Sequence, residues 1–365
     1  MSRKSIPTNG VETPNWRCLL LCFAAIIGLE VFYLSEAVFA VERLPELSLP
    51  YLIRSGVLLA ATAVGVWGFV YGRSPKFQIS QSPGPWPERL STAVVLLGTL
   101  ACLALFTVFP RLFNVLSRED YPVEWGSALL LFASSFLAAY ALFANPLIKA
   151  QSPFLKFMLG LLSAVFFIIA MEEISWFQRV IDIKSPESFA GNAQAEMNLH
   201  NFATNEIEYI YYFCAFGFLV VLPFLRFAFP SLGRNQFMNL FVPKPYVAVV
   251  GAVACAYNYD MWNSVLTQFA FFSSTIMLCF FAANASLRKD RIIVVGAIAL
   301  LVTSQLVFLI NGSNFGRLWT ITEYKEFFIP LAFLVYSWDA FINPGPVGLL
   351  PAGSSTSGNP QAKYV

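Results

Sequence analysis

The sequence is poor in charged residues and in histidine. Asp, Glu, Lys and Arg together make up only 12% of its 365 residues, whereas 57% are hydrophobic and 37 are phenylalanine. A chain of this length with so little charge does not fold as a soluble globular domain. The single histidine, His200, also excludes a zinc site with three histidine ligands.

Cysteine is scarce too, and none falls in a loop that we predict to be extracytoplasmic. All six lie within or beside long apolar stretches, at Cys18, Cys22, Cys102, Cys214, Cys255 and Cys279. This placement argues against a disulfide framework and against a zinc site built from thiolates. Cys18 and Cys22 share a helix face at i, i+4, and we interpret them as small apolar residues instead of lipidation sites.

Familiar recognition motifs are missing from the chain. It contains no nucleophile elbow, phosphate-binding loop or nucleotide fingerprint. It also has no basic patch with interleaved aromatic residues, so the sequence predicts no nucleic-acid partner. Function must therefore be inferred from the placement of its polar residues.

What the chain does have is a series of apolar stretches of membrane-spanning length. A bilayer core of about 30 Å needs roughly 20 apolar residues per helix, and about ten stretches approach that length. They are residues 19–41, 51–70, 90–109, 125–144, 154–170, 209–225, 246–257, 265–283, 292–310 and 327–342. The seventh is short and runs into "NYDMW", which indicates a short span or a helix that breaks near the surface. The sequence predicts an all-α polytopic transmembrane bundle.

The polar residues divide the chain into three parts. Residues 1–16 are a short basic cytoplasmic segment, and residues 17–343 form one transmembrane domain with an extracytoplasmic polar segment at 172–206. Residues 344–365 are rich in Gly, Ser and Pro, so we expect a disordered cytoplasmic tail. The first apolar stretch is too long for a cleaved signal peptide, so we expect it to be retained as an anchor.

Basic residues indicate the orientation of the bundle. They occur before the first span and in alternate loops, at Arg3, Lys4, Arg17, Arg73, Lys76, Arg89, Lys149, Lys156, Arg226, Arg234, Lys244, Arg288, Lys289 and Arg291. Short cytoplasmic loops are enriched in Lys and Arg. Ten spans with both termini in the cytoplasm put all of these residues on that side. We expect a multi-pass protein of the cell membrane, specifically the bacterial inner membrane.

Acidic residues gather on the opposite side. Sixteen of the 21 Asp and Glu residues map there: Glu36, Glu42, Glu46, Glu119, Asp120, Glu124, Glu172, Glu173, Asp182, Glu187, Glu196, Glu206, Glu208, Asp260, Glu323 and Glu326. Insertion does not require this, because Asp and Glu contribute little to orientation. The distribution suggests a shared extracytoplasmic cavity more than scattered solvation.

The stretch "MEEISWFQR", residues 171–179, ends the fifth span with two adjacent carboxylates. No Gly or Pro interrupts it, so we expect the helix to continue and to align Glu172 with Arg179 as a pair. Glu173 is then turned about 100° away, free to face a neighbour as a proton donor or acceptor. The alternative is an interfacial anchor, with Trp176 in the aromatic belt.

The stretch "NAQAEMNLHN" places polar residues at every second position: Asn192, Gln194, Glu196, Asn198 and His200. A strand would put all five on one face, whereas a helix would align only part of the set. Both readings keep Glu196 and His200 on the same side. A neighbouring carboxylate would orient the imidazole as a general base, although a lone histidine is otherwise an ordinary surface or hydrogen-bonded residue.

These motifs carry a family resemblance. "EEISWFQR", followed about twenty residues later by "NLHN" and preceded by "EDYPVEW", resembles a signature of bacterial polytopic membrane proteins without an established activity. The paired glutamates are also distantly similar to CAAX-type intramembrane proteases, in which three residues separate the glutamates from an arginine. Here five residues separate Glu173 from Arg179 and only one histidine exists, so the metal site of those proteases cannot form.

Further polar residues are predicted on the same side. Glu30 lies near the middle of the first span, where an ionised carboxylate is costly and is normally turned inward, and Glu36 lies less than two turns further out. Glu323 and Glu326 share a helix face at i, i+3 before the last span, with Arg317 nearby. We expect these side chains to line the same cavity.

The leading hypothesis is an extracytoplasmic hydrolase or transferase acting on a lipid or lipid-linked substrate in the bilayer. Its predicted catalytic groups are Glu172, Glu173, Glu196 and His200. Its predicted substrate-binding groups are Trp176, Gln178, Arg179, Asn198, Asn201, Arg317, Glu323 and Glu326. Carboxylates with one imidazole also suit a divalent cation, Mg²⁺, Mn²⁺ or Ca²⁺.

Two other classes of function stay open. A transporter would use Glu30 and the extracytoplasmic acids to attract a cation or relay protons. Against this, the charges concentrate at one surface and no internal repeat is visible. A non-catalytic scaffold would use the polar segment to dock a protein partner, which the sequence does not identify.

Overall fold

The computed structural model is a bundle of helices. It describes residues 15–33, 49–73, 75–79, 87–192, 196–230, 232, 236–257, 265–317 and 319–342. Within these ranges there is no β-strand, only an isolated parallel bridge between Phe77 and Ala285. The predicted all-helical fold is confirmed.

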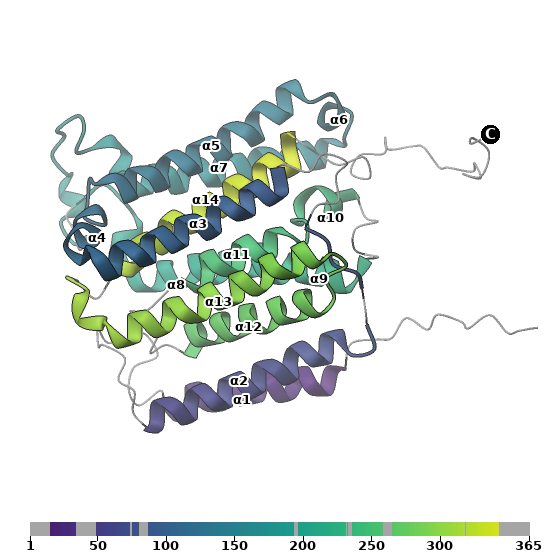
Figure 1. The fold of residues 1–365 in the computed structure, drawn as a ribbon. Coiled ribbons are helices and arrows are strands. Elements are labelled where there is room, and N and C mark those ends of the chain that lie inside the picture. Colours follow the sequence, from purple (N-terminus) through teal and green to yellow (C-terminus); the bar gives the residue numbers. More distant parts are fainter. Residues whose placement is uncertain are drawn as a thin grey trace, which may run out of the picture.

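The longer helices lie side by side along one common direction (Figure 1). They are α1 (Trp16–Tyr33), α2 (Leu49–Val70), α3 (Pro87–Val108), α5 (Pro122–Ala144), α7 (Pro153–Glu173), α8 (Thr204–Phe216), α11 (Val247–Ala256), α12 (Val265–Ala283), α13 (Arg288–Ile310) and α14 (Thr320–Ser337). Shorter helices are α4 (Pro110–Leu116), α6 (Pro146–Lys149), α9 (Leu222–Ala228) and α10 (Gln236–Phe241). Five consecutive helices, α3 to α7, begin with proline, whose fixed φ and missing N–H suit the first turn.

Seven of the described helical segments are long and apolar enough to cross a membrane. They lie in α2, α3, α5, α7, α12, α13 and the continuous stretch Glu206–Ala228. The other three expected spans correspond to α1, α11 and α14, which are shorter or carry more charge. The chain therefore has the build of a multi-pass membrane protein, while ten spans and two cytoplasmic termini stay predictions.

The connections between helices separate charge toward the two ends of the bundle. We name these ends after α4 and α10, which lie at opposite sides of Figure 1. Connections α2 to α3, α5 to α7, α9 to α11 and α12 to α13 lie at the α10 end, and these are the basic connections of the sequence. Two buried acids compensate them, because Asp290 pairs with Arg89 at 3.4 Å and Asp339 pairs with Lys244 at 2.7 Å.

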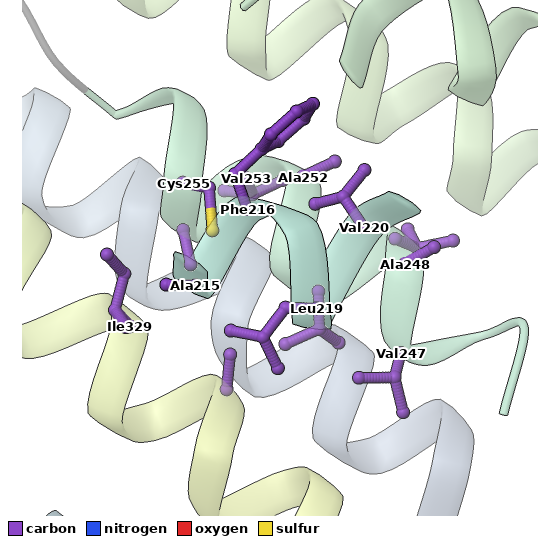
Figure 2. Close-up of a cluster of buried hydrophobic side chains, with 14 of the residues drawn as sticks. Ala215, Phe216, Leu219, Val220, Val247, Ala248, Ala252, Val253, Cys255 and Ile329 are labelled. Carbon is purple, nitrogen blue, oxygen red and sulfur yellow. The ribbon is translucent and has the colours of Figure 1, made fainter. Parts of the chain in front are cut away.

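Helix α11 is the buried centre of the bundle. Its side chains from Val247 to Cys255 are at most 2% exposed, and it packs against α12, α14 and α3. Figure 2 shows this cluster, in which Val247, Ala248 and Ala252 lie close to Leu219 and Val220. The 10 residues of α11 rise about 15 Å, roughly half of a bilayer core, and residues 258–264, which follow it, lie outside the described part.

One close approach fixes α11 against its neighbour. A π-helical turn, Gly217–Val221, joins α8 to α9, and its Leu219 faces Gly251 of α11. A Cβ atom on Gly251 would lie 2.6 Å from the Leu219 carbonyl oxygen and 2.7 Å from the Leu219 Cβ. Only glycine permits this spacing, in the manner of small residues at membrane helix interfaces.

Helices α1 and α2 form a closely packed pair, and α2 also packs on α12. Cys18 and Cys22 lie against two glycines of α2: a Cβ atom on Gly68 would be 2.5 Å from the Cys18 Cβ, and one on Gly65 would be 2.8 Å from the Cys22 Sγ. This packing agrees with the interpretation of both cysteines as small apolar residues. Between α2 and α12, Arg54 donates from Nε to the Gln268 side-chain oxygen at 3.1 Å.

We predict that Gly251→Ala destabilises the bundle by about 1–3 kcal/mol, because the added methyl group must push α11 away from the Leu219 backbone. The measurement is the thermal unfolding midpoint of the purified protein in detergent. Gly296→Ala in α13 is the matched control, since a Cβ atom there meets nothing within 4 Å. Equal midpoints for the two variants would contradict the close approach.

Candidate functional site

Helix α7 ends at Glu173 in a left-handed turn. The φ angle is 47° at Ser175, 55° at Trp176 and 62° at Phe177. Three consecutive non-glycine residues with positive φ cannot continue the bonding pattern of an α-helix. The expectation that this helix runs on through Arg179 is therefore wrong, because contacts with distant residues override the helical propensity of the stretch.

Side-chain hydrogen bonds hold the left-handed turn. Trp176 donates from Nε1 to Glu172 Oε1 at 2.7 Å, and the Ser175 hydroxyl donates to Glu196. The Phe177 amide donates to the Ile174 carbonyl oxygen at 3.0 Å. Strained backbone of this kind costs about 1 kcal/mol or more per residue and persists only where its surroundings over-determine it.

Residues 174–203, which we name the connecting segment, join α7 to α8. Residues 193–195, which include Gln194, lie outside the described part. On either side of them the segment consists of turns, bends and 3₁₀ turns. Neither the strand nor the continuous helix considered for this stretch is present in its described residues. Several polar side chains are nonetheless buried: Ser175, Gln178, Asn192, Glu196, Asn198 and Asn201.

These buried polar groups satisfy one another. The Gln178 side-chain oxygen accepts from the Met197 amide at 2.6 Å, which ties the two arms of the segment together. Asn192 donates to the Asn198 carbonyl oxygen at 2.7 Å, and the Asn198 amide donates to Glu196 at 3.1 Å. Gln178 and Asn198, expected to bind substrate, thus have partners within the segment, as buried polar groups require.

Arg179 joins the connecting segment to the turn between α4 and α5. It forms ion pairs with Glu196, with Asp120 at 2.8 Å and with Glu119 at 3.5 Å. The predicted pair between Arg179 and Glu172 is wrong, because the left-handed turn directs Arg179 away from α7. A guanidinium with several donors in a fixed plane suits this triple pairing.

The carboxylate beside the histidine is Glu172. Its Oε2 atom lies 3.5 Å from His200 Nδ1 and accepts from the backbone amides of Leu199 at 2.6 Å and His200 at 3.2 Å. The Glu172 side chain is 14% exposed and the His200 side chain 31%. Four contacts, counting the Trp176 indole, therefore hold Glu172 in place beside a half-buried imidazole.

Glu173 points in a different direction, into the bundle. It accepts from the Ser127 hydroxyl of α5 at 3.2 Å and interacts electrostatically with Glu124, Glu323 and Glu326. We name these four glutamates the acidic cluster. They come from α5, α7 and α14, so the fold gathers carboxylates that are up to 202 positions apart in sequence, from Glu124 to Glu326.

Two residues of the acidic cluster's surroundings were not singled out from the sequence. The Tyr212 hydroxyl of α8 donates to Glu326, and the Lys325 ammonium lies 4.1 Å from the centroid of the Tyr212 ring. Lys325 is only 3% exposed, which for a lysine demands compensation. Its place between Glu323 and Glu326 in "TEYKEFF" is the signal that could have pointed to it.

Arg317 lies at the α4 end but serves the packing of α4. It donates to the Ser117 carbonyl oxygen at 2.6 Å and lies 3.8 Å from Glu323. Asn114 of α4 reinforces the same junction, accepting from the Gly316 amide at 2.6 Å and donating to the Asn314 carbonyl oxygen at 2.8 Å. Asn114 carried no signal in the sequence beyond its position in a short polar connection.

The predicted site is thus assembled as two neighbouring groups and one separate pair. Glu172 and His200 form the first group, the acidic cluster forms the second, and His200 interacts electrostatically with Glu326 between them. Glu196 belongs instead to the pair with Arg179 and does not contact His200 through any described hydrogen bond. Glu36 lies outside the described residues, and nothing is described of the Glu30 side chain.

Metal binding has no preformed site in the described part of the chain. Among those residues, no group of three or more His, Cys, Asp and Glu side chains is arranged to hold an ion. The four glutamates of the acidic cluster interact electrostatically, but they are not among such groups. A divalent cation, Mg²⁺, Mn²⁺ or Ca²⁺, stays a prediction of the sequence.

We predict that Arg179→Gln destabilises the connecting segment by about 2 kcal/mol, because Glu196 loses its ion pair with the Arg179 guanidinium. Solvent moderates the effect, since the Arg179 side chain is 24% exposed. Hydrogen exchange of the amides in residues 174–203 measures it. The double variant Arg179→Gln, Glu196→Gln should lose less than the sum of the single variants. Lys184→Gln, at an exposed position of the same segment, is the control. Strict additivity would contradict the pairing.

Comparison of the chain with models of protein families, with curated proteins and with solved structures gave no match.

Proposed function

We propose that the chain is a membrane-embedded hydrolase or transferase that acts on a lipid or lipid-linked substrate, with His200 as its general base. The observation that carries this proposal is the pairing of Glu172 with His200. The carboxylate is fixed by the Trp176 indole and two backbone amides, while the imidazole stays 31% exposed. A rigid carboxylate beside a reachable imidazole is the arrangement that base catalysis needs.

The proposed chemistry follows from the two ring nitrogens. Glu172 faces Nδ1 and favours the tautomer that carries its proton there, which leaves Nε2 to accept a proton from water or a substrate hydroxyl. The activated oxygen then attacks the electrophilic atom of the scissile bond. That bond breaks, and the imidazolium donates the proton to the leaving group. Negative charge on Glu172 stabilises the imidazolium between these steps.

We also propose that the chain groups with the bacterial membrane proteins that share "EEISWxQR" and "NLHN" and that it resides in the bacterial inner membrane. Contacts between the two motifs support a common role for them. Glu172 of the first motif bonds Leu199 and His200 of the second, and Ser175 bonds Asn198 at 3.1 Å. The two stretches act as one structural unit.

We predict that His200→Ala and Glu172→Gln each reduce turnover about 10²–10⁴-fold, because the base is lost or loses its orientation. Mass spectrometry of total lipids from a deletion strain, complemented with each variant, provides the measurement. A species that accumulates on deletion should be cleared by the unmodified protein and by the exposed control Glu206→Gln, but by neither site variant. Clearance by both site variants at equal abundance contradicts the proposed catalytic role.

A cation- or proton-coupled transporter is the second candidate, and the acidic cluster is the observation that favours it. Four carboxylates, Tyr212 and the buried Lys325 bring titratable groups from four helices together inside the bundle. Such groups within a membrane bundle are a common mark of ion pathways.

For the transporter, we predict that Glu173→Gln and Glu326→Gln abolish proton or cation flux into proteoliposomes, while His200→Ala retains it. Flux is followed with an entrapped pH- or ion-sensitive dye. A Glu30→Gln variant that alone loses function would also favour transport. If the unmodified protein shows no flux and does turn over a lipid, the transporter hypothesis is wrong and the enzyme hypothesis is supported.

A further inference from the structure

The connecting segment buries several polar side chains and exposes several large apolar ones. Six polar residues within it are buried, as described above. Seven large apolar side chains are exposed on it, Trp176, Phe177, Val180, Ile181, Ile183, Leu199 and Phe202, together with the charged residues Asp182, Lys184 and Glu187. Val180 and Ile181 are each 59% exposed and Leu199 is 63% exposed. A loop in water normally does not expose so many large apolar side chains while it buries six polar ones.

This apolar surface is continuous with the membrane-facing surface of the spans. Phe202 precedes α8 by two residues, and Ile207 and Ile210 of α8 are exposed in the same way, Ile210 to 64%. At the other arm, Trp176 and Phe177 come three and four residues after the last residue of α7, Glu173. Both arms therefore begin close to the ends of apolar helices.

Tight turns keep the exposed residues close to the end of α7. The Val180 and Ile181 amides both donate to the Phe177 carbonyl oxygen, at 3.0 Å and 3.1 Å, and the Ile183 amide donates to the Gln178 carbonyl oxygen at 3.1 Å. The chain thus folds back on itself instead of extending into solvent. Figure 1 shows the segment, in teal, against the α4 end of the bundle.

We infer that the connecting segment is seated in the membrane, with Val180, Ile181, Ile183, Leu199 and Phe202 in the boundary between headgroups and acyl chains of the leaflet at the α4 end. The inward-facing polar network is what this location requires, because backbone and side-chain polar groups must find partners within the protein where water is scarce. The occupant of the apolar surface is bilayer lipid. This inference stands independently of the proposed catalytic activity.

The seating has a consequence for the proposed site. Leu199 comes one residue before His200 and Phe202 two residues after it, and both are exposed, so the inferred seating puts the histidine at the level of the acyl-chain boundary. On the proposed function, substrate reaches His200 laterally from the leaflet. A lipid or lipid-linked molecule travels in that plane, whereas a water-soluble metabolite does not.

The test uses single cysteines in the full-length protein, reconstituted at one copy per lipid nanodisc. We expect Ile181→Cys and Ile183→Cys to react with a membrane-impermeant maleimide about 100-fold more slowly than Ser188→Cys, a polar exposed position of the same segment, because a thiol in apolar surroundings forms little thiolate. The unmodified protein measures background labelling by its own six cysteines. Bimane attached at Ile181→Cys should be quenched by brominated acyl chains, as at the lipid-facing control Ile210→Cys.

Rapid labelling at both isoleucine positions in nanodiscs overturns the inference, as does slow labelling without quenching by brominated lipid. Protection that is present in native membranes but lost in single-copy nanodiscs also overturns it, and assigns the surface to a protein partner or a second copy. Unfolding midpoints equal to that of the unmodified protein confirm that the cysteine variants are folded.

Discussion

The ion pair between Arg179 and Glu196 is the constraint on which the arrangement of the α4 end depends. Glu196 also accepts from Ser175 and Asn198, and Arg179 also binds Asp120. One pair of charges therefore connects three separate stretches: the turn after α7, the stretch before α8 and the turn between α4 and α5. Breaking a partly buried pair leaves an uncompensated charge, so these stretches are stabilised together.

That constraint is what allows adjacent glutamates to take different roles. Consecutive helical residues project about 100° apart, so Glu172 and Glu173 point away from each other at the end of α7. The left-handed turn then brings the chain back over Glu172, which meets Leu199 and His200, while Glu173 stays inside the bundle beside Ser127. The imidazole and the acidic cluster thus become neighbours without sharing hydrogen-bond partners.

Much of the bundle was predictable from the sequence, because apolar length alone identifies helices that must bury their backbone in lipid. The partners of individual polar residues were not. Periodicity assigned Arg179 to Glu172 along a helix, whereas three positive φ angles at residues 175–177 redirect it to Glu196 and Asp120. Those angles depend on contacts across the connecting segment, which local propensity does not contain. Tyr212 and Asn114 were missed for the same reason, since their partners lie 114 and about 200 residues away.

The contact between Arg54 and Gln268 has a consequence for biogenesis. These residues are 214 positions apart, so a ribosome delivers α2 to the membrane long before α12 exists. An arginine in a lone transmembrane helix costs about 2.5–3.5 kcal/mol at the bilayer centre and less near its edge. The early hairpin of α1 and α2 must keep Arg54 close to the headgroups during synthesis and dock it afterwards. Helices α1 and α2 are thus made first, but the contact of Arg54 with Gln268 forms only after α12 has been inserted.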